Sequence, residues 1–161
     1  MWNAILDMLV LLVVVNGAPI IAARVFAARY DTPVDLGARL PDGRPLFGSS
    51  KTWRGLAAAA LSCTLVAPLL GYSAQFGLVF SCLAMAGDLG SSFLKRRLGL
   101  NPSDQCLGVD QIPEALLPCM YTVTIAGLPW WLVILVPLLF MALELLVSRP
   151  LYHLKIRKRP Y

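Results

Sequence analysis

Residues 72–97 read Tyr72-Ser-Ala-Gln-Phe-Gly-Leu-Val-Phe-Ser-Cys-Leu-Ala-Met-Ala-Gly-Asp-Leu-Gly-Ser-Ser-Phe-Leu-Lys-Arg-Arg97. This largely apolar run reaches an aspartate, Asp88, and ends in three consecutive basic residues. A helix of about 20 apolar residues crosses a bilayer, and Lys and Arg collect at its cytoplasmic end. The stretch therefore predicts a membrane-spanning helix whose charged end faces the cytoplasm.

The other basic residues follow the same pattern. Of the 14 Lys and Arg residues, six lie between Arg24 and Arg54, three at 95–97 and five between Arg149 and Arg159. The two short connections near 72–75 and 126–129 contain none. Because basic loops stay cytoplasmic, this alternation predicts a multi-pass membrane protein with its chemistry on the cytoplasmic side.

Five apolar stretches indicate where the helices cross. They lie at about residues 5–23, 55–70, 72–94, 112–125 and 128–147. The second and fourth are short and need flanking residues or a locally thin bilayer. We therefore expect an all-α integral membrane protein with about five transmembrane helices. An odd number places the termini on opposite sides, and the acidic start favours an outside N-terminus and a cytoplasmic C-terminus.

Composition limits the class of protein further. The chain is 58% hydrophobic and 14% charged with a net charge of +5, whereas soluble proteins are about a quarter charged. Its 161 residues predict one membrane domain, with a site built from loops 24–54 and 95–111 and a basic cytoplasmic tail at 148–161. The basic layer favours anionic headgroups or a phosphate-bearing substrate over nucleic acid. Four cysteines without a CxxC and one histidine argue against a zinc site.

The first cytoplasmic loop is a candidate anion site. It enters the second apolar stretch through Lys51, Thr52 and Arg54, where helix N–H groups and two full charges favour a phosphate. The Gly-x-x-Lys-Thr string is not a P-loop, because the first glycine and the preceding strand of that motif are missing. A solvated basic rim remains the alternative interpretation.

Two aspartates form the second candidate. Asp88 lies at or just inside the inner membrane boundary, where an ionisable group is costly unless it is paired. Lys95 follows seven residues later on the same helix face, and a helical hairpin would bring Asp110 near Asp88. Two carboxylates beside many cations suggest Mg²⁺ shared with a nucleotide. An arginine ion pair for Asp88 and a helix cap for Asp110 are the alternatives.

Polar residues elsewhere bear on the rival functions. Asn16 and Pro19 interrupt the first apolar run and either line the same cavity or mark a proline kink. A transporter would spread polar residues through several spans, whereas here they gather at the inner ends apart from Asn16 and Glu144. A small transporter subunit and a catalytically silent scaffold that binds anionic lipid remain the alternatives to an enzyme.

Seven strings together resemble, in order and spacing, the CDP-archaeol synthase family, which is similar to the phosphatidate cytidylyltransferases. They are Asn16-Gly-Ala-Pro19, Pro33-Val-Asp-Leu-Gly37, Asp42-Gly-Arg44, Lys51-Thr-Trp-Arg-Gly55, Gly87-Asp88, Ser92-Phe-Leu-Lys-Arg-Arg97 and Leu107-Gly-Val-Asp-Gln111. The resemblance covers residues 10–125, and the tail at 151–161 resembles a bacterial branch.

The resemblance implies a nucleotidyltransferase that uses CTP and Mg²⁺ to convert a phosphorylated lipid, archaeol-phosphate-like or phosphatidate-like, into a CDP-lipid with release of pyrophosphate. It implies a site facing the cytoplasm in the inner cell membrane and leaves a homo-oligomer open. Asp88 and Asp110 would be the metal-binding acids and, with Lys95, the catalytic residues. CTP and phosphate contacts would come from Lys51, Thr52, Arg54, Arg96, Arg97, Asn16 and Asp42. Asp35 matches an acidic family position with a supporting role.

Two positions depart from the family pattern. Gly48-Ser-Ser50 stands where the family commonly has Gly-Asp-Gly, and Pro113 stands where it commonly has an aspartate. Glu114 follows directly, so the site has either a shifted ligand or one ligand fewer.

Overall fold

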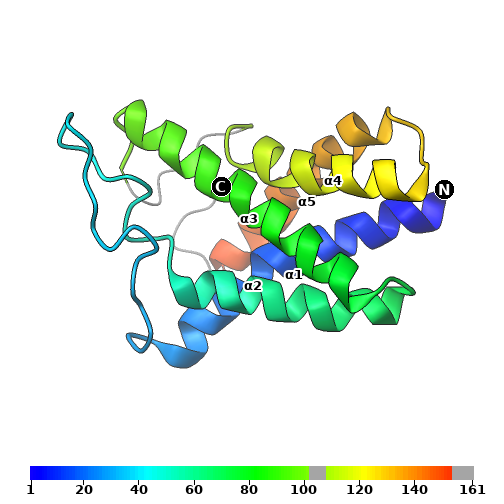
Figure 1. Ribbon diagram of the computed structural model, residues 1–161, viewed down its shortest axis with the longest axis horizontal. Helices are drawn as coiled ribbons and strands as arrows, with labels where there is room; N and C mark the ends of the chain where they lie inside the picture. Colours follow the sequence, from blue (N-terminus) through cyan, green and yellow to red (C-terminus); the bar gives the residue numbers. More distant parts are fainter. Residues whose placement is uncertain (102–107, 154–161) are drawn as a thin grey trace.

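The computed structural model describes residues 1–101 and 108–153, with side chains as far as Val147 apart from that gap (Figure 1). These residues form five α-helices and one 3₁₀ helix. Their bounds are α1 Trp2–Phe26, α2 Trp53–Val66, η1 Ala67–Leu70, α3 Ala74–Arg97, α4 Gln111–Ala126 and α5 Leu132–His153. The predicted all-α class is confirmed. Cys106, Leu107 and the side chains of the predicted basic tail fall outside the described part of the chain.

The helices pack mainly in chain order. Each of α1 to α4 packs against the next helix, and α5 returns to α1. The connection from α1 to α2 lies at the same end of the molecule as the C-terminal end of α3 and the N-terminal end of α4 (Figure 1). The N-terminus and the two short turns lie at the other end. The fold therefore gathers the basic residues of 24–54 and 95–97 at one end.

Helix starts follow polar caps rather than the edges of the apolar runs. The side-chain oxygens of Thr52 and Ser73 each accept a hydrogen bond from the backbone N–H three residues later. Such N-caps satisfy an otherwise unpaired donor in the first turn. The helices therefore begin directly after these residues, not at the starts predicted for spans 55–70 and 72–94. The final helix begins at Leu132, four residues after the predicted start.

In the part of the chain whose side chains are described, three segments are long and apolar enough to cross a membrane, namely 2–26, 53–70 and 74–97. Helix α4 has 16 residues, and α5 is apolar over Leu132–Val147, the part of it whose side chains are described. Helices at all five predicted places are confirmed, and among residues 1–101 and 108–147 three of them meet the length and hydropathy that a span requires unaided. Membrane crossing by α4 and α5 stays a prediction.

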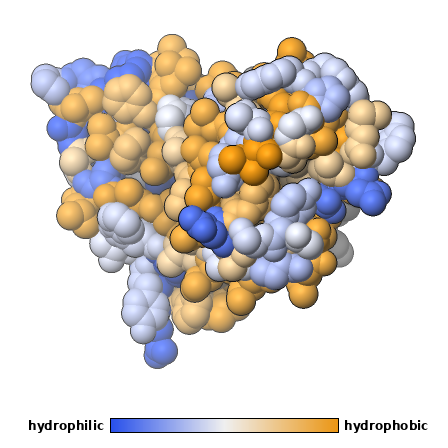
Figure 2. Space-filling view, turned by 45° about the vertical axis from the view of Figure 1, so that its right-hand side comes forward, coloured by the Kyte–Doolittle hydropathy of each residue, from blue (hydrophilic) through white to orange (hydrophobic). Residues whose placement is uncertain are grey.

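The outer surface is rich in apolar side chains. On α2, Leu61 and Leu65 are 64% and 71% exposed, and their spacing of four places them along one helix face. Leu69 in the following η1 is 82% exposed. Figure 2 shows a broad hydrophobic surface with hydrophilic residues in smaller patches. Large exposed apolar patches on a folded protein mark a surface that another apolar phase covers. Hydrocarbon chains of a bilayer fit this surface.

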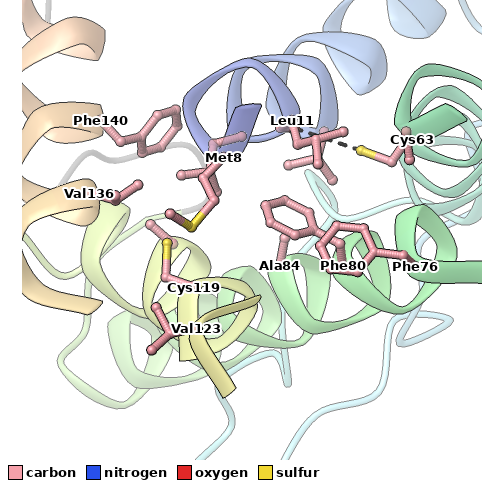
Figure 3. Packing of buried hydrophobic residues seen from close by; sticks show 14 of the residues in the cluster. Met8, Leu11, Cys63, Phe76, Phe80, Ala84, Cys119, Val123, Val136 and Phe140 are labelled. Carbon is pink, nitrogen blue, oxygen red and sulfur yellow. Dashed lines mark hydrogen bonds between the residues drawn. The ribbon is translucent and has the colours of Figure 1, made fainter. Parts of the chain in front are cut away.

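The core joins all five helices (Figure 3). Met8, Phe80, Cys119 and Phe140 are almost completely buried and come from α1, α3, α4 and α5. Cys63 of α2 completes the cluster, and its thiol is 3.7 Å from the carbonyl oxygen of Leu11. Cys63 and Cys119 therefore serve as small core residues. This packing fixes the helix ends that carry the charged residues.

Two glycines in α3 allow backbone contact with its neighbours. A Cβ at Gly77 would lie 2.3 Å from the carbonyl oxygen of Cys63 in α2. A Cβ at Gly87 would lie 2.1 Å from the carbonyl oxygen of Pro113 in α4. Neither distance is physically tolerable, so both contacts require glycine. The second contact also places Asp88 beside the first turn of α4.

Gly77→Ala is expected to destabilise the protein by about 1–3 kcal/mol, because α2 and α3 must separate to admit the methyl group. Gly90→Ala is the matched control, since its Cβ would meet no atom within 4 Å on the same helix. Alanine is favoured over glycine in a helix by up to about 1 kcal/mol, so the control should melt no lower than wild type. Thermal unfolding in detergent compares them, and equal melting temperatures would contradict the close contact.

Candidate active site

The first loop closes on itself before α2 begins. The N–H of Val34 donates to the carbonyl of Lys51 (2.8 Å), and the N–H of Trp53 donates to the carbonyl of Thr32 (3.1 Å). Backbone pairing between Pro33 and Thr52 completes this base. The chain therefore returns from an excursion of about 20 residues to a fixed point at the start of α2, and the Lys51 side chain projects from that point.

Lys51 pairs with the membrane-boundary aspartate. Its Nζ lies 2.6 Å from both Oδ1 and Oδ2 of Asp88, across 37 residues of sequence. The two side chains are 24% and 18% exposed, so the pair is partly shielded from water. An ion pair between Asp88 and an arginine was one interpretation of the sequence, whereas the structure pairs Asp88 with Lys51 of the first loop. The pair joins α3 to the start of α2.

Asp110 is held in a similar way. The Nζ of Lys95, near the end of α3, lies 2.5 Å from Oδ1 of Asp110. Asp110 occupies the residue before α4 but makes no side-chain capping hydrogen bond. The helix-cap interpretation is therefore wrong for this geometry. Each predicted metal-binding acid is therefore paired with a lysine. The family resemblance assigned Lys51 to the nucleotide and Lys95 to catalysis.

A cavity of about 370 Å³ adjoins the Lys51–Asp88 pair. Its lining combines small apolar side chains of α1 with charged and hydroxyl groups of the loop, α2 and α3. The lining residues are Pro19, Ala23, Ala27, Asp31, Ser49, Ser50, Lys51, Thr52, Arg54, Gly55, Leu56, Met85 and Asp88. Ligand pockets are commonly this size, with a few polar groups that fix orientation. A lining that combines apolar and charged side chains suits a ligand that carries both phosphate and hydrocarbon.

Arg54 braces the end of α1. Its Nη1 donates to the carbonyls of Ala27 (2.7 Å) and Arg29 (2.8 Å), and its Nη2 pairs with Asp31 at 2.8 Å. A cation at a helix C-terminus satisfies carbonyls that lack intrahelical partners. The predicted phosphate contact of Arg54 stays a prediction, and in this structure both terminal nitrogens already have protein partners.

Arg97 ties the tip of the loop to the end of α3. It lies 2.5 Å from Asp42 through Nη1 and 2.6 Å from the carbonyl of Pro45 through Nη2, with its guanidinium over the Phe93 ring. Arg44 returns the contact by donating to the Arg97 carbonyl. Neither Asp42 nor Arg97 lines the cavity. Their predicted ligand roles remain untested, and their visible role is to dock the loop.

Of the other residues predicted to bind the nucleotide or phosphate, one lines the cavity and two do not. Thr52 lines the cavity, although its hydroxyl caps α2. Arg96 is buried, and Asn16 donates to the carbonyl of Leu12 in its own helix at 3.1 Å. Pro19, one turn further on, does reach the cavity.

The sequence interpretation missed Ser49 and Ser50 as lining residues. In the sequence these two serines stand out only as a departure from the family pattern. Their position between Gly48 and the predicted phosphate contact Lys51 is the one feature that could have indicated their place in the lining.

The donor set fits magnesium with few protein ligands. Within residues 1–101 and 108–147, no group of three or more His, Cys, Asp or Glu side chains is arranged to hold a metal ion. Mg²⁺ is commonly held by one or two carboxylates, with waters and substrate phosphates completing its octahedron. Asp88 and Asp110 provide such carboxylates. Glu114 is buried in α4 and does not form a group of three possible ligands with them.

Comparison with known proteins identifies the family. The family model described as CarS-like, CDP-archaeol synthase, matches residues 1–79 and 72–161. A CDP-archaeol synthase of Saccharolobus islandicus (strain L.S.2.15 / Lassen #1) is 32% identical over 136 residues, covering 81% of this chain and 82% of the relative. One of Pyrococcus furiosus is 33% identical over 132 residues, covering 76% and 74%.

A solved structure agrees with this relationship. It is an intramembrane enzyme for archaeal membrane lipids biosynthesis, with a TM-score of 0.67 and 27% identity over 86% of this chain and 91% of that one. The residues that the family model matches include Lys51, Asp88 and Asp110. The chain belongs to the CarS-like, CDP-archaeol synthase family.

Proposed function

We propose that this protein is a CTP-dependent nucleotidyltransferase that converts a phosphorylated lipid into a CDP-lipid and releases pyrophosphate. Family membership and the intramembrane neighbour support the activity. The observation that carries the proposal is a cavity lined both by the Lys51–Asp88 pair and by apolar side chains of α1. That arrangement suits a reaction in which one substrate is a nucleotide and the other keeps its chains in the bilayer.

The reaction needs placement more than covalent chemistry. An oxygen of the lipid phosphate attacks the α-phosphorus of CTP, and the bond from that phosphorus to the oxygen bridging to the β-phosphate breaks. The electron pair leaves with pyrophosphate, so no protein nucleophile is required. Both substrates are anions, and their approach is repulsive until positive charge offsets it. Lys51 and Lys95 supply that charge and orient the phosphates, the main source of catalysis in such transfers.

We assign Asp88 and Asp110 to a magnesium ion. When bound, the ion would neutralise charge on the triphosphate and on the pyrophosphate as it leaves. The two acids come from α3 and the start of α4, and the contact of Gly87 with Pro113 holds these elements together. The backbone of residue 113 therefore packs against α3, and two carboxylates are enough for the ion we propose.

The lipid is assigned from the relatives. Their name makes an archaeol-type isoprenoid ether phosphate the first candidate and a phosphatidate the second. The small side chains of Pro19, Ala23 and Ala27 leave space for hydrocarbon beside the charged residues. The named relatives are archaeal and give no support to the bacterial branch predicted from the tail.

We propose that all five helices cross the inner cell membrane, with the N-terminus outside and the site and C-terminus cytoplasmic. The gathering of residues 24–54 and 95–97 at one end supports this orientation, since basic loops stay cytoplasmic. Mg²⁺, CTP, a lipid phosphate and the bilayer are the expected partners. A homo-oligomer stays a sequence-level expectation.

The proposal is tested by pyrophosphate release from purified protein in detergent. CTP and Mg²⁺ are supplied with archaeol phosphate, with phosphatidate or with no lipid. We expect release only with lipid, and faster release with the ether lipid. Silence with every lipid, from protein that melts cooperatively and binds CTP, would favour the scaffold that lacks activity. Solute flux in liposomes without CTP turnover would favour the transporter.

A further inference from the structure

Asp35 organises the first loop from within. It is only 8% exposed, and its carboxylate accepts three backbone hydrogen bonds. Oδ1 accepts from the N–H of Gly37 (3.0 Å), and Oδ2 accepts from Phe47 (2.9 Å) and Gly48 (2.8 Å). These donors are two, 12 and 13 residues away, so one carboxylate joins both sides of the loop. Asp35 does not line the cavity, and the proposed mechanism does not use it.

The ionised form of Asp35 is the one that the loop fits. Burial by itself raises the pKa of this carboxyl, but the N–H groups of Gly48, Phe47 and Gly37 together lower the pKa below its ordinary value. Hydrogen bonds donated to a carboxylate favour its charged form. An amide of the same shape has one oxygen and one NH₂, so it cannot accept on both sides of the loop.

The two residues that Asp35 holds through Oδ2 lead directly into the cavity lining. Gly48 has φ +98°, a conformation that favours glycine, and its carbonyl accepts from the N–H of Lys51 at 3.2 Å. The Lys51 carbonyl is held in turn by the N–H of Val34, next to Asp35 in sequence. The short turn of residues 48–51 is therefore fixed at both ends.

Ser49 and Ser50 lie between those two fixed points and line the cavity. Serine hydroxyls donate hydrogen bonds to anionic oxygens, as lysine does with full charge. Lys51 leaves the same turn to reach Asp88 at 2.6 Å. Three donors suited to phosphate thus depend on the placement of one turn.

We propose that Asp35 is a positioning residue for the nucleotide, because it holds the turn that presents Ser49, Ser50 and Lys51 to the triphosphate. This inference rests on the proposed function of the cavity. The turn contacts the nucleotide and not the lipid chains, which run along α1. Loss of Asp35 should therefore affect CTP far more than the lipid substrate.

The test compares Asp35→Asn and Asp35→Glu with Asp7→Asn. Asp7 lies near the start of α1, whose N-terminal end is at the opposite end of the molecule from the loop (Figure 1), and its carboxylate accepts a hydrogen bond from the Tyr72 hydroxyl. For Asp35→Asn we expect the KM for CTP to rise about tenfold or more, with the KM for lipid phosphate within about twofold of wild type. Asp35→Glu, which keeps two charged acceptors, should recover part of the loss. Asp7→Asn should match wild type in both constants.

Hydrogen exchange of the ligand-free protein provides a readout that does not need turnover. In Asp35→Asn the peptide covering residues 47–51 should exchange faster, while peptides of α3 stay protected. Unchanged exchange or an unchanged KM for CTP would overturn the inference. Equal rises in both KM values together with a lower melting temperature would also overturn it, because they indicate a general structural role. If Asp35→Asn does not fold, Asp35→Glu decides by the same criteria, and failure of both variants to fold counts against positioning.

Failure of the proposed function is visible separately. If wild-type protein gives no lipid-dependent product, the activity is refuted, and the exchange result still shows whether Asp35 holds the turn.

Discussion

Asp88→Asn is expected to lower CDP-lipid formation by at least about 10²-fold, the scale of losing one electrostatic group at a reacting centre. Asparagine keeps the shape of the side chain but removes the charge that pairs with Lys51 and that we assign to magnesium. The fold should survive, because Asp88 and Lys51 are both partly exposed and water can solvate the remaining lysine. Product formation at saturating CTP and lipid is the measurement.

The control for this variant is Asp7→Asn, which removes the same charge from the first part of α1, whose N-terminal end lies at the other end of the molecule (Figure 1). It should form product at the wild-type rate. Melting temperatures show whether either variant has lost its fold. Product formation by folded Asp88→Asn within about twofold of wild type would refute the role of this carboxylate in the reaction.

Lys51→Met is expected to have two effects of opposite sign. The KM for CTP should rise by about tenfold or more, because a charged phosphate contact is lost. Binding of a divalent ion without nucleotide should become tighter, since Lys51 occupies both oxygens of Asp88 in the ligand-free structure. Mn²⁺ observed by electron paramagnetic resonance measures the second effect without turnover.

Arg39→Met is the matched control for charge. Arg39 belongs to the same loop and donates to the Gly43 carbonyl in an exposed position, away from the cavity lining. It should leave the KM for CTP and the Mn²⁺ affinity at wild-type values. Weaker or unchanged Mn²⁺ binding in Lys51→Met would show that Lys51 does not compete with metal for Asp88, and the assignment of Asp88 to magnesium would then lose its support.

The helices, and the gathering of the charged residues at one end of the molecule, could be predicted because both depend on patterns in short stretches of sequence. Apolar runs about long enough to span a bilayer, and basic residues at alternate connections between them, can be read directly from the sequence. The loop base with Lys51 and the helix with Asp88 were assigned to one site, and the ion pair between them confirms that they meet. The exact helix starts were missed because Ser73 and Thr52 act as caps outside the apolar runs.

Side-chain partners could not be predicted, since they depend on contacts between distant segments. Arg54 and Arg97 are basic residues beside a candidate phosphate site. The neighbouring sequence does not show that Arg54 bonds the end of α1 or that Arg97 pairs with Asp42 of the loop. Asn16 looked like a cavity residue but bonds within its own helix. The hold of Asp35 on Gly48 spans 13 residues and follows from loop geometry alone.

The central claim is transfer of the cytidylyl group, and labelled CTP tests it most directly. Purified protein is given archaeol phosphate and Mg²⁺ with CTP labelled either at the α-phosphate or at the γ-phosphate. We predict that the α-label enters the lipid, that the γ-label leaves in pyrophosphate, and that one pyrophosphate forms for each CDP-lipid. Transfer of the γ-label to the lipid, or release of phosphate without labelled lipid, would contradict the proposed reaction.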